Sequence, residues 1–373
     1  MKGCDSVIQS HFNSYKVKYD TLNKYMTPIC NSQIVNSMNV FINLDDLFHT
    51  LHNPLINNEF QICGKDASKQ MISNIFNLIA HYRYWAIKNH YTCKVYCIYT
   101  TTMRSFKNNV YLPEYRSYYK KINAIENSGC YFVNTSIQDT TPLLGIISKY
   151  IPDVYTIDSK YLEPSMIPLF ISEEVSKADW NLMISRDSYD LQYAYRNKWS
   201  LISPKGDNSR VVNQQGIWNY VNYKEKVFKD EVDLKYPYDM YILSKAVVGD
   251  KYRGIPRLRK IGWKTLFKFL DEVMSENSDA STTTLKIKLI EKIKGRSMLS
   301  NTDINNNLNS INVELQYDAM MEIDKTLITS QIIDVPDYDN LQELNRTKFD
   351  KYPLNLQFLC NNQTINRMKT PFD

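Results

Sequence analysis

The sequence predicts an α/β fold in which helices flank a mostly parallel sheet. Three short apolar runs, at 38–43, 93–100 and 181–185, are typical of buried strands. Between the first two lies 67–90, where apolar residues recur at helical spacing. Short strands that alternate with helical segments favour parallel pairing. In such sheets binding sites lie at the carboxyl ends of the strands, so the residues that follow each run are the first candidates for a site.

The segments around these strands carry weaker signals. A helix is expected to begin after the first strand, and further helices at 140–150 and 160–171. From about 235 onward the pattern is helical, with a polar linker at 275–281 and a loop expected at 305–310. The predicted organisation is an N-terminal extension at 1–37, an α/β domain at 38–234 and a helical region at 235–373.

The bulk composition fits a globular intracellular protein. The chain has 373 residues, 43% of them hydrophobic, and a net charge of +5, which fits nucleic-acid binding without demanding it. Seven cysteines without a CxxC pair indicate reduced, packed thiols, and the five histidines lack the spacing of a zinc site. Neither a signal peptide nor a run of 18 apolar residues is present, so we expect a cytoplasmic protein with no membrane contact.

The segment 246–270 combines glycine, positive charge and the start of a helix. Gly249, Gly254 and Gly262 fall close together, and 250–268 holds seven Lys or Arg residues against one Asp. Backbone N–H groups at a helix start beside glycine bind anions, and each phosphate contact adds salt-sensitive affinity. A solvated pair of basic helices would have the same composition, so composition leaves both interpretations open.

The order of residues in this segment resembles the helix–three-turn–helix of the 5′-nuclease family, the flap endonucleases and their phage and polymerase-linked relatives. The residues in register are Gly249, Asp250, Ile255, Pro256, Ile261, Gly262, Lys264, Thr265 and Leu270. The resemblance implies a PIN-like α/β domain followed by a helical DNA-binding region. The DNA contacts that it implies here are Lys251, Arg257, Arg259, Lys260, Gly262, Lys264 and Thr265.

Other segments follow the order of the same family. The first predicted strand, the stretch at 151–171 and the segment 181–193 are similar to its first strand, its carboxylate-bearing helix and its third strand. The basic and aromatic stretch at 103–121 is similar to the arch around single-stranded flaps, which implies DNA contacts at Arg104, Tyr115 and Arg116. A surface helix that packs its tyrosines on the core would show the same pattern.

Family members cleave DNA with two Mg²⁺ ions, which a dense cluster of carboxylates holds. Carried over onto this sequence, Glu163 and Asp187 keep a carboxylate as candidate catalytic and metal-binding residues. The family carboxylates are replaced at Asn43, Ser165, Met166, Tyr189 and Arg253. Two carboxylates leave two dications under-neutralised, so we expect no resident cofactor and a lost or impaired cleavage.

A slip of register by one residue would change this expectation, because it flips side chains between the faces of a strand. Asp45 lies just past Asn43, and Asp190 lies just past Tyr189. If Asp45 and Asp190 turn inward, they could converge with Glu163 and Asp187. The four carboxylates together could then hold Mg²⁺. As caps of helices that follow strands, Asp45 and Asp190 would need no metal.

Three functions remain open on this sequence. The first is a DNA-binding protein of the 5′-nuclease fold without cleavage, with branched or single-stranded DNA as its partner in replication or repair. The second is an active Mg²⁺-dependent 5′–3′ exonuclease or structure-specific endonuclease. The third is a viral structural or assembly protein that uses the fold for protein partners. Metal dependence separates the first two, and the salt dependence of DNA affinity separates the first from the third.

Overall fold

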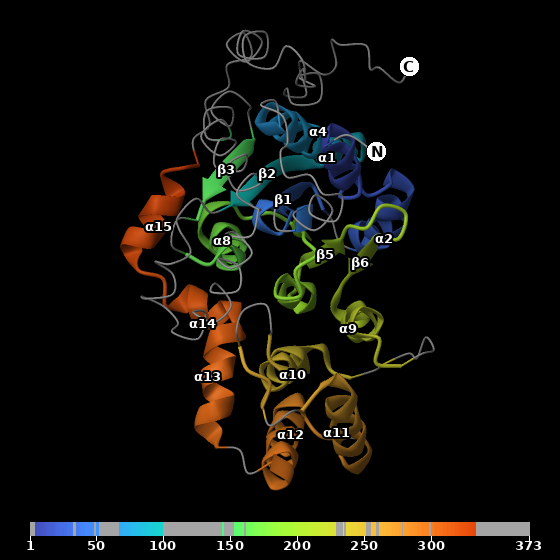
Figure 1. Ribbon diagram of the computed structural model, residues 1–373, viewed down its shortest axis with the longest axis vertical. Coiled ribbons are helices and arrows are strands. Elements are labelled where there is room, and N and C mark those ends of the chain that lie inside the picture. Colours follow the sequence, from blue (N-terminus) through green and yellow to red (C-terminus); the bar gives the residue numbers. More distant parts are fainter. Residues whose placement is uncertain are drawn as a thin grey trace.

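The computed structural model places a sheet between helices, with a group of helices from the second half of the chain below it (Figure 1). The residues that it describes are 4–32, 35–47, 50–51, 67–99, 144, 153–159, 162–228, 234, 236–250, 255–258, 261–277, 279–297 and 300–332. Among them, no helix combines the length and the apolar character that a membrane span requires.

The described strands form one six-stranded sheet in the order β3-β2-β1-β4-β5-β6. Neighbours from β3 to β5 pair in parallel, and β6 is antiparallel to β5, which confirms the predicted mostly parallel sheet. Three strands were predicted and are confirmed: β1 (Ser37–Asn43), β2 (Thr92–Tyr99) and β4 (Trp180–Ile184). The others were not predicted: β3 (Val154–Asp158), β5 (Trp199–Ser203) and β6 (Arg210–Val212).

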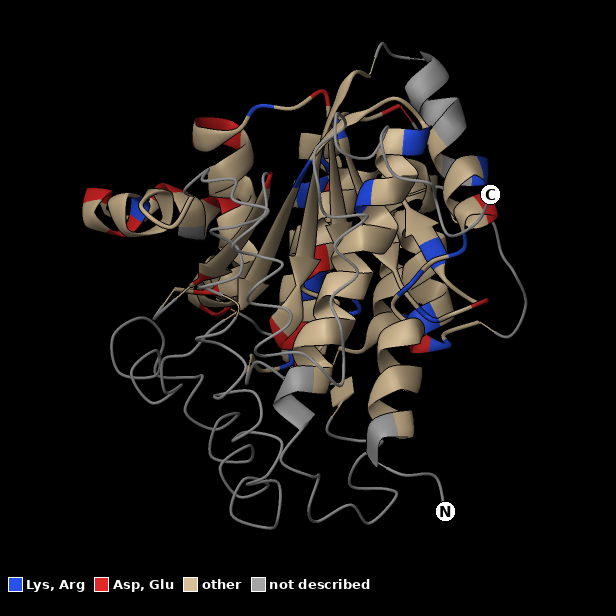
Figure 2. Ribbon diagram, turned by 90° about the horizontal axis from the view of Figure 1, so that it is seen from above, with Lys and Arg blue, Asp and Glu red and all other residues tan. Residues whose placement is uncertain are grey.

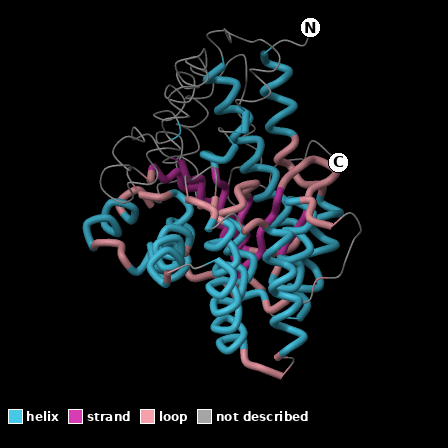
Figure 3. The backbone as a smooth tube through the Cα atoms, turned by 60° about the horizontal axis from the view of Figure 1, so that its bottom comes forward, coloured by secondary structure: helices cyan, strands magenta, loops and turns pink. Residues whose placement is uncertain are grey.

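Alternating side chains of the central strand enter two separate cores. Val40 and Ile42 face the core that they share with α1 (Cys4–Asn13), α2 (Tyr19–Ser32) and α4 (Ala67–Lys88). Phe41 points to the opposite face and stacks between Tyr96 and Trp199. Helices therefore cover both faces of the sheet, as Figure 3 shows for the magenta strands among cyan helices.

The second core is covered by short helical turns and one longer helix. The helix expected at 160–171 is confirmed only in part, because Pro164 starts a 3₁₀ turn that passes into α-helix and then into a π-turn. The elements of this layer are η2 (Pro164–Met166), α8 (Ile167–Phe170), η3 (Ile171–Val175), η4 (Asp190–Tyr195), η5 (Gln214–Gly216), α9 (Ile217–Glu225) and η6 (Tyr238–Met240).

Up to residue 332, the remaining helices confirm the helical pattern predicted after 235. They are α10 (Tyr241–Val248), α11 (Trp263–Glu276), α12 (Thr282–Ser297), α13 (Asn301–Ile311), α14 (Val313–Asp318) and α15 (Glu322–Thr329). The loop expected at 305–310 is wrong, because these residues lie within α13. Ser300 and Asp303 form a capping box that starts this helix, and Ile304, Asn307 and Ile311 anchor its buried face.

Candidate functional site at the carboxyl edge of the sheet

The carboxyl end of β1 is held by a buried amide. The side-chain amide nitrogen of Asn43 donates to Asp190 Oδ2 over 2.8 Å, and its Oδ1 accepts from the backbone N–H of Asp46 over 3.0 Å. Asn43 thus joins the helical turn that follows β1 to the start of η4, which lies just beyond β4. Parallel neighbours place both strand ends at the same edge, and this is the edge at which sites of such sheets lie.

The carboxyl group of Asp190 is sealed from solvent. Its side chain is 0% exposed. Burial raises the pKa of Asp190 to about 7, the negative charge of Asp187 adds to that increase, and the hydrogen bond from Asn43 opposes it. Asp190 therefore keeps its proton to a higher pH than an exposed carboxyl group does.

Asp46 is the second carboxyl group at this edge, and it is half-buried. Its Oδ2 accepts from the hydroxyl of Tyr15 over 2.9 Å and from the backbone N–H of Arg186 over 2.8 Å. Burial raises the pKa of Asp46 to about 6; the Arg186 N–H opposes the shift, and the charge of Asp187 reinforces it. Asp46 therefore ties the N-terminal segment to the loop after β4.

Asp187 shapes the loop in which it lies. Its Oδ1 accepts from the backbone N–H of Tyr189 over 2.9 Å, and its own N–H donates to Ser185 Oγ over 3.0 Å. Such a short-range turn fixes the carboxylate of Asp187 between Asp46 and Asp190, whose pKa values it raises. Asp187 is half-buried, and it is the more accessible neighbour of Asp190.

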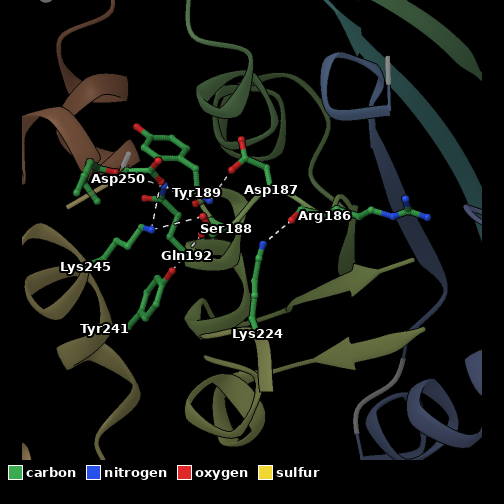
Figure 4. A network of polar contacts seen from close by, with 10 residues as sticks. Arg186, Asp187, Ser188, Tyr189, Gln192, Lys224, Tyr241, Lys245 and Asp250 are labelled. Atoms are coloured by element: carbon green, nitrogen blue, oxygen red, sulfur yellow. Dashed lines mark hydrogen bonds and ion pairs between the residues drawn. The ribbon is translucent and has the colours of Figure 1, made fainter. Parts of the chain in front are cut away.

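Cationic side chains surround this loop. The guanidinium of Arg186 lies over the ring of Tyr15, 4.1 Å from its centroid, and donates to Ser14 Oγ over 2.6 Å. The ammonium group of Lys224 donates to the carbonyl oxygen of Arg186 over 2.6 Å (Figure 4). Arg186 therefore connects the loop to the N-terminal segment, and Lys224 of α9 holds the loop backbone in place.

A buried ion pair joins the loop to the helices below it. Lys245 Nζ lies 3.2 Å from Asp250 Oδ2, and the two residues are 6% and 4% exposed. The same ammonium group lies 3.4 Å from Ser188 Oγ, and the hydroxyl of Tyr241 donates to the carbonyl oxygen of Ser188 over 3.0 Å (Figure 4). Sequence reasoning missed the role of Lys245, whose signal is a single lysine within the apolar helix YILSKAVV.

The other sequence-predicted carboxylates are Asp45 and Glu163. Asp45 is half-buried in the turn after β1, and Glu163 is the half-buried N-cap residue of η2. Ser165, Met166 and Tyr189, which stand at positions where the resemblance implies carboxylates, are all buried. Arg253 lies outside the described residues.

The donors at this edge do not fit a pair of divalent cations. An amide N–H of Asn43 points at Asp190 where a metal would need an oxygen lone pair, and Asp190 is enclosed and prone to carry a proton. Within the described part of the chain, no three Asp, Glu, His or Cys side chains are arranged as a metal site. Hydrogen bonds between side chains and backbone connect the strand ends at this edge of the sheet.

The predicted DNA-contacting residues near α11 lie around the N-terminus of this helix, which no side chain caps. Gly262 is the N-cap residue, no side chain caps the helix, and the first turn carries no acidic residue. Arg257 and Lys264 are exposed, Thr265 is half-buried, and a Cβ added at Gly262 would lie 3.5 Å from the guanidinium of Arg257. The remaining predicted contacts lie outside the described residues: Lys251, Arg259, Lys260, Arg104, Tyr115 and Arg116.

Comparison with known proteins finds similar folds among solved structures. No family model matches the chain, and no curated protein matches it. The fold is similar to that of T5 5′-exonuclease with divalent zinc ions bound, at 17% sequence identity and a TM-score of 0.45. The match covers 84% of this chain and 99% of the T5 chain.

Proposed function

We propose that this protein binds DNA and does not cleave it by two-metal catalysis. The observation that carries the proposal is the hydrogen bond from the Asn43 amide to the enclosed carboxyl group of Asp190. A two-metal centre needs several ionised carboxylates that face an open site. At this edge one strand end offers an amide donor, and the neighbouring carboxyl group is shielded and has a pKa of about 7.

DNA binding is supported by the start of α11. The free N–H groups of a first helical turn, with the positive end of the helix dipole, attract phosphate. Exposed Lys264 and Arg257 add two positive charges beside Gly262. The guanidinium of Arg257 lies close to the same positive helix end, and an anion between them would relieve that repulsion. A phosphate of the DNA backbone has the charge and the acceptor oxygens for this position.

The test uses an end-labelled DNA with a 5′ flap, with either Mg²⁺ or Mn²⁺ present. The wild-type protein and an Asp187→Ala variant are prepared in parallel, and both cleavage and retardation of the DNA are followed. We expect retardation without cleavage by either protein. Arg257→Gln/Lys264→Gln should weaken retardation, because two phosphate contacts are lost.

Two results would contradict the proposal in different ways. Cleavage by the wild type that Asp187→Ala abolishes would establish an active metal-dependent nuclease, in which Asp187 and its neighbours hold the ions. Absence of both cleavage and retardation would favour a structural or assembly role with protein partners. In that case the open start of α11 does not serve DNA.

A further inference from the structure

A second basic surface lies on the side of the molecule formed by the β5–β6 turn and the end of α9. We call it the Tyr223 surface, and its members are Lys205, Arg210, Tyr223, Lys224 and Lys226. Tyr223 is 38% exposed. None of these residues stands in the segments that the sequence analysis assigned to DNA.

Two cations are held against the ring of Tyr223. The guanidinium carbon of Arg210 lies 3.8 Å from the ring centroid, and Lys205 Nζ lies 5.8 Å from it. Lys205 Nζ also lies 3.4 Å from the Tyr223 hydroxyl. A guanidinium that stacks on a ring uses one face and keeps its in-plane N–H donors free for a planar, bidentate acceptor. Phosphate oxygens are such acceptors.

The backbone beneath this surface is pinned at several points. Ser209 Oγ donates to the carbonyl oxygen of Gly206, and the N–H of Gly206 donates to the carbonyl oxygen of Ser14 over 2.9 Å. From the helix side, the hydroxyl of Tyr220 donates to Ser203 Oγ over 2.6 Å, one turn before Tyr223. The cations of the turn and of the helix are therefore presented at fixed separation, which lowers the entropic cost of binding a ligand.

The cations of this surface lack acidic partners, in contrast to those of the neighbouring helices. Among the described residues, Lys205, Arg210, Lys224 and Lys226 form no ion pair with a carboxylate. The lysines of α11 and α12 that do form such pairs are Lys268, Lys286, Lys288 and Lys292. The charge of these four lysines is thus neutralised, whereas the positive charge around Tyr223 is left available.

Acidic groups near this surface are few. Asp207 in the same turn is 2.7 Å from Lys18, which neutralises it, and Glu225 is exposed on α9. The opposite side of the molecule differs, because Asp and Glu dominate the helices at the left of Figure 2, where α14 and α15 lie. An anionic polymer would therefore be attracted to the Tyr223 side and repelled from the α14–α15 side.

We propose that the Tyr223 surface binds the phosphodiester backbone of the DNA that also contacts the start of α11. This inference rests on the proposed function, since it assigns a second part of the same DNA footprint. The two parts belong to one packed unit, because Trp218 of α9 contacts Phe267 of α11 with their ring centroids 5.9 Å apart. Lys224 bonds the Arg186 carbonyl, so the surface reaches the loop at the carboxyl edge of the sheet.

The test compares three variants by fluorescence anisotropy with a labelled duplex that carries a 5′ single-stranded overhang. The surface variant is Lys205→Gln/Arg210→Gln/Lys226→Gln, which spares Lys224 because that residue holds the Arg186 loop. The control, Lys268→Gln/Lys286→Gln/Lys288→Gln, removes the same charge from paired lysines. The third variant is Arg257→Gln/Lys264→Gln at the start of α11. Affinity is measured between about 50 and about 200 mM KCl.

Log affinity falls linearly with log salt concentration, and each phosphate contact adds about 0.9 to the steepness of this fall. We expect the surface variant to make the slope less steep by about 2 to 3. The control should change affinity by less than about 3-fold, because its lysines are paired with carboxylates and are not expected to contact phosphate. A surface variant that behaves like the control, while the α11 variant loses affinity, would overturn this inference and leave the proposed function standing. Wild-type protein without salt-dependent binding would overturn both.

Discussion

The ammonium group of Lys245 lies 3.2 Å from the carboxylate of Asp250, and both side chains are almost fully buried. The pair connects the last turn of α10 to the turn that follows it, and the ammonium group also approaches Ser188 in the loop after β4. A buried charge depends on its partner far more than an exposed one does. The pair is therefore the electrostatic link between the sheet edge and the helices below.

Removal of Lys245 should destabilise the fold strongly. Lys245→Met leaves the Asp250 carboxylate buried without this counter-charge, and we expect a loss of about 3 to 5 kcal/mol in the free energy of unfolding. Lys245→Met/Asp250→Asn should recover a large part of that loss. Urea unfolding measures both variants, with Lys288→Met as the control, because the exposed Lys288–Glu291 pair should contribute under about 1 kcal/mol. Equal losses of unfolding free energy in Lys245→Met and Lys288→Met would contradict a special stabilising role of the buried pair.

Asp190 should make stability fall as pH rises. Its pKa is about 7 in the folded protein and about 4 in an unfolded chain, so the folded state holds the proton more tightly. The stability that this group contributes is complete below about pH 4 and is lost as pH approaches about 7, at up to roughly 1.4 kcal/mol per pH unit.

The measurement is the difference in unfolding free energy between wild type and Asp190→Asn, taken from about pH 4 to about pH 8. Taking this difference removes the contributions of the other titrating groups, which the two proteins share. Asp46, with a pKa of about 6, shifts stability in the same direction as Asp190. His11 and His81, whose pKa values burial lowers to about 4, act in the opposite direction up to about pH 6.5. A difference that stays constant with pH would show that Asp190 is ionised throughout.

Gly249 should not tolerate a side chain. Its φ is 77°, and an added Cβ would lie 2.7 Å from backbone atoms of Ile255 and Pro256. We expect Gly249→Ala to cost more than about 2 kcal/mol of unfolding free energy, because backbone must move. Gly295 in α12 is the matched control, since nothing lies within 4 Å of its added Cβ. Gly295→Ala should stabilise the protein by up to about 1 kcal/mol. Thermal unfolding distinguishes this gain in stability from the loss expected for Gly249→Ala.

Asn43→Asp should weaken the sheet edge instead of improving it. The change removes the N–H that bonds Asp190 and places a second carboxyl group 2.8 Å from it. We expect a loss of about 1 to 3 kcal/mol that is larger at about pH 8 than at about pH 5, because two ionised neighbours repel. Asn305→Asp on the exposed face of α13 serves as the control. Added Mn²⁺ that stabilised the wild-type protein would contradict the poor fit of this edge to a metal.

The sequence predicted the central strands because their apolar runs are continuous. β1, β2 and β4 are buried on both faces, which leaves an unambiguous run in each. β3 reads VYTID, where Thr and Asp interrupt the apolar run, and β6 has only three residues, so both fall below what periodicity resolves. In α13 the many asparagines suggested a loop, while three buried positions at helical spacing decide the structure.

The candidate site could be predicted in position but not in its contacts. Asn43 does end β1 at the edge where a site was expected, and Asp187 and Asp190 do follow β4. The bonds from Tyr15 to Asp46 and from Arg186 to Ser14 join residues that are 31 and 172 positions apart in the chain. No local pattern encodes such contacts, because they depend on how the N-terminal segment packs on the sheet.

The central position of β1 sets the order in which the chain can fold. β1 pairs with β2 and, on its other side, with β4, where Met38 is in register with Trp180. The side-chain amide of Asn39 donates to Asn181 Oδ1 across that pair, so the middle of the sheet closes over a separation of 142 residues. Such long-range pairing slows folding, since the loop must close before its contacts form. During synthesis β1 therefore waits with one edge unpaired until β4 has left the ribosome, and this interval is when the chain is most open to association with another chain or with a chaperone.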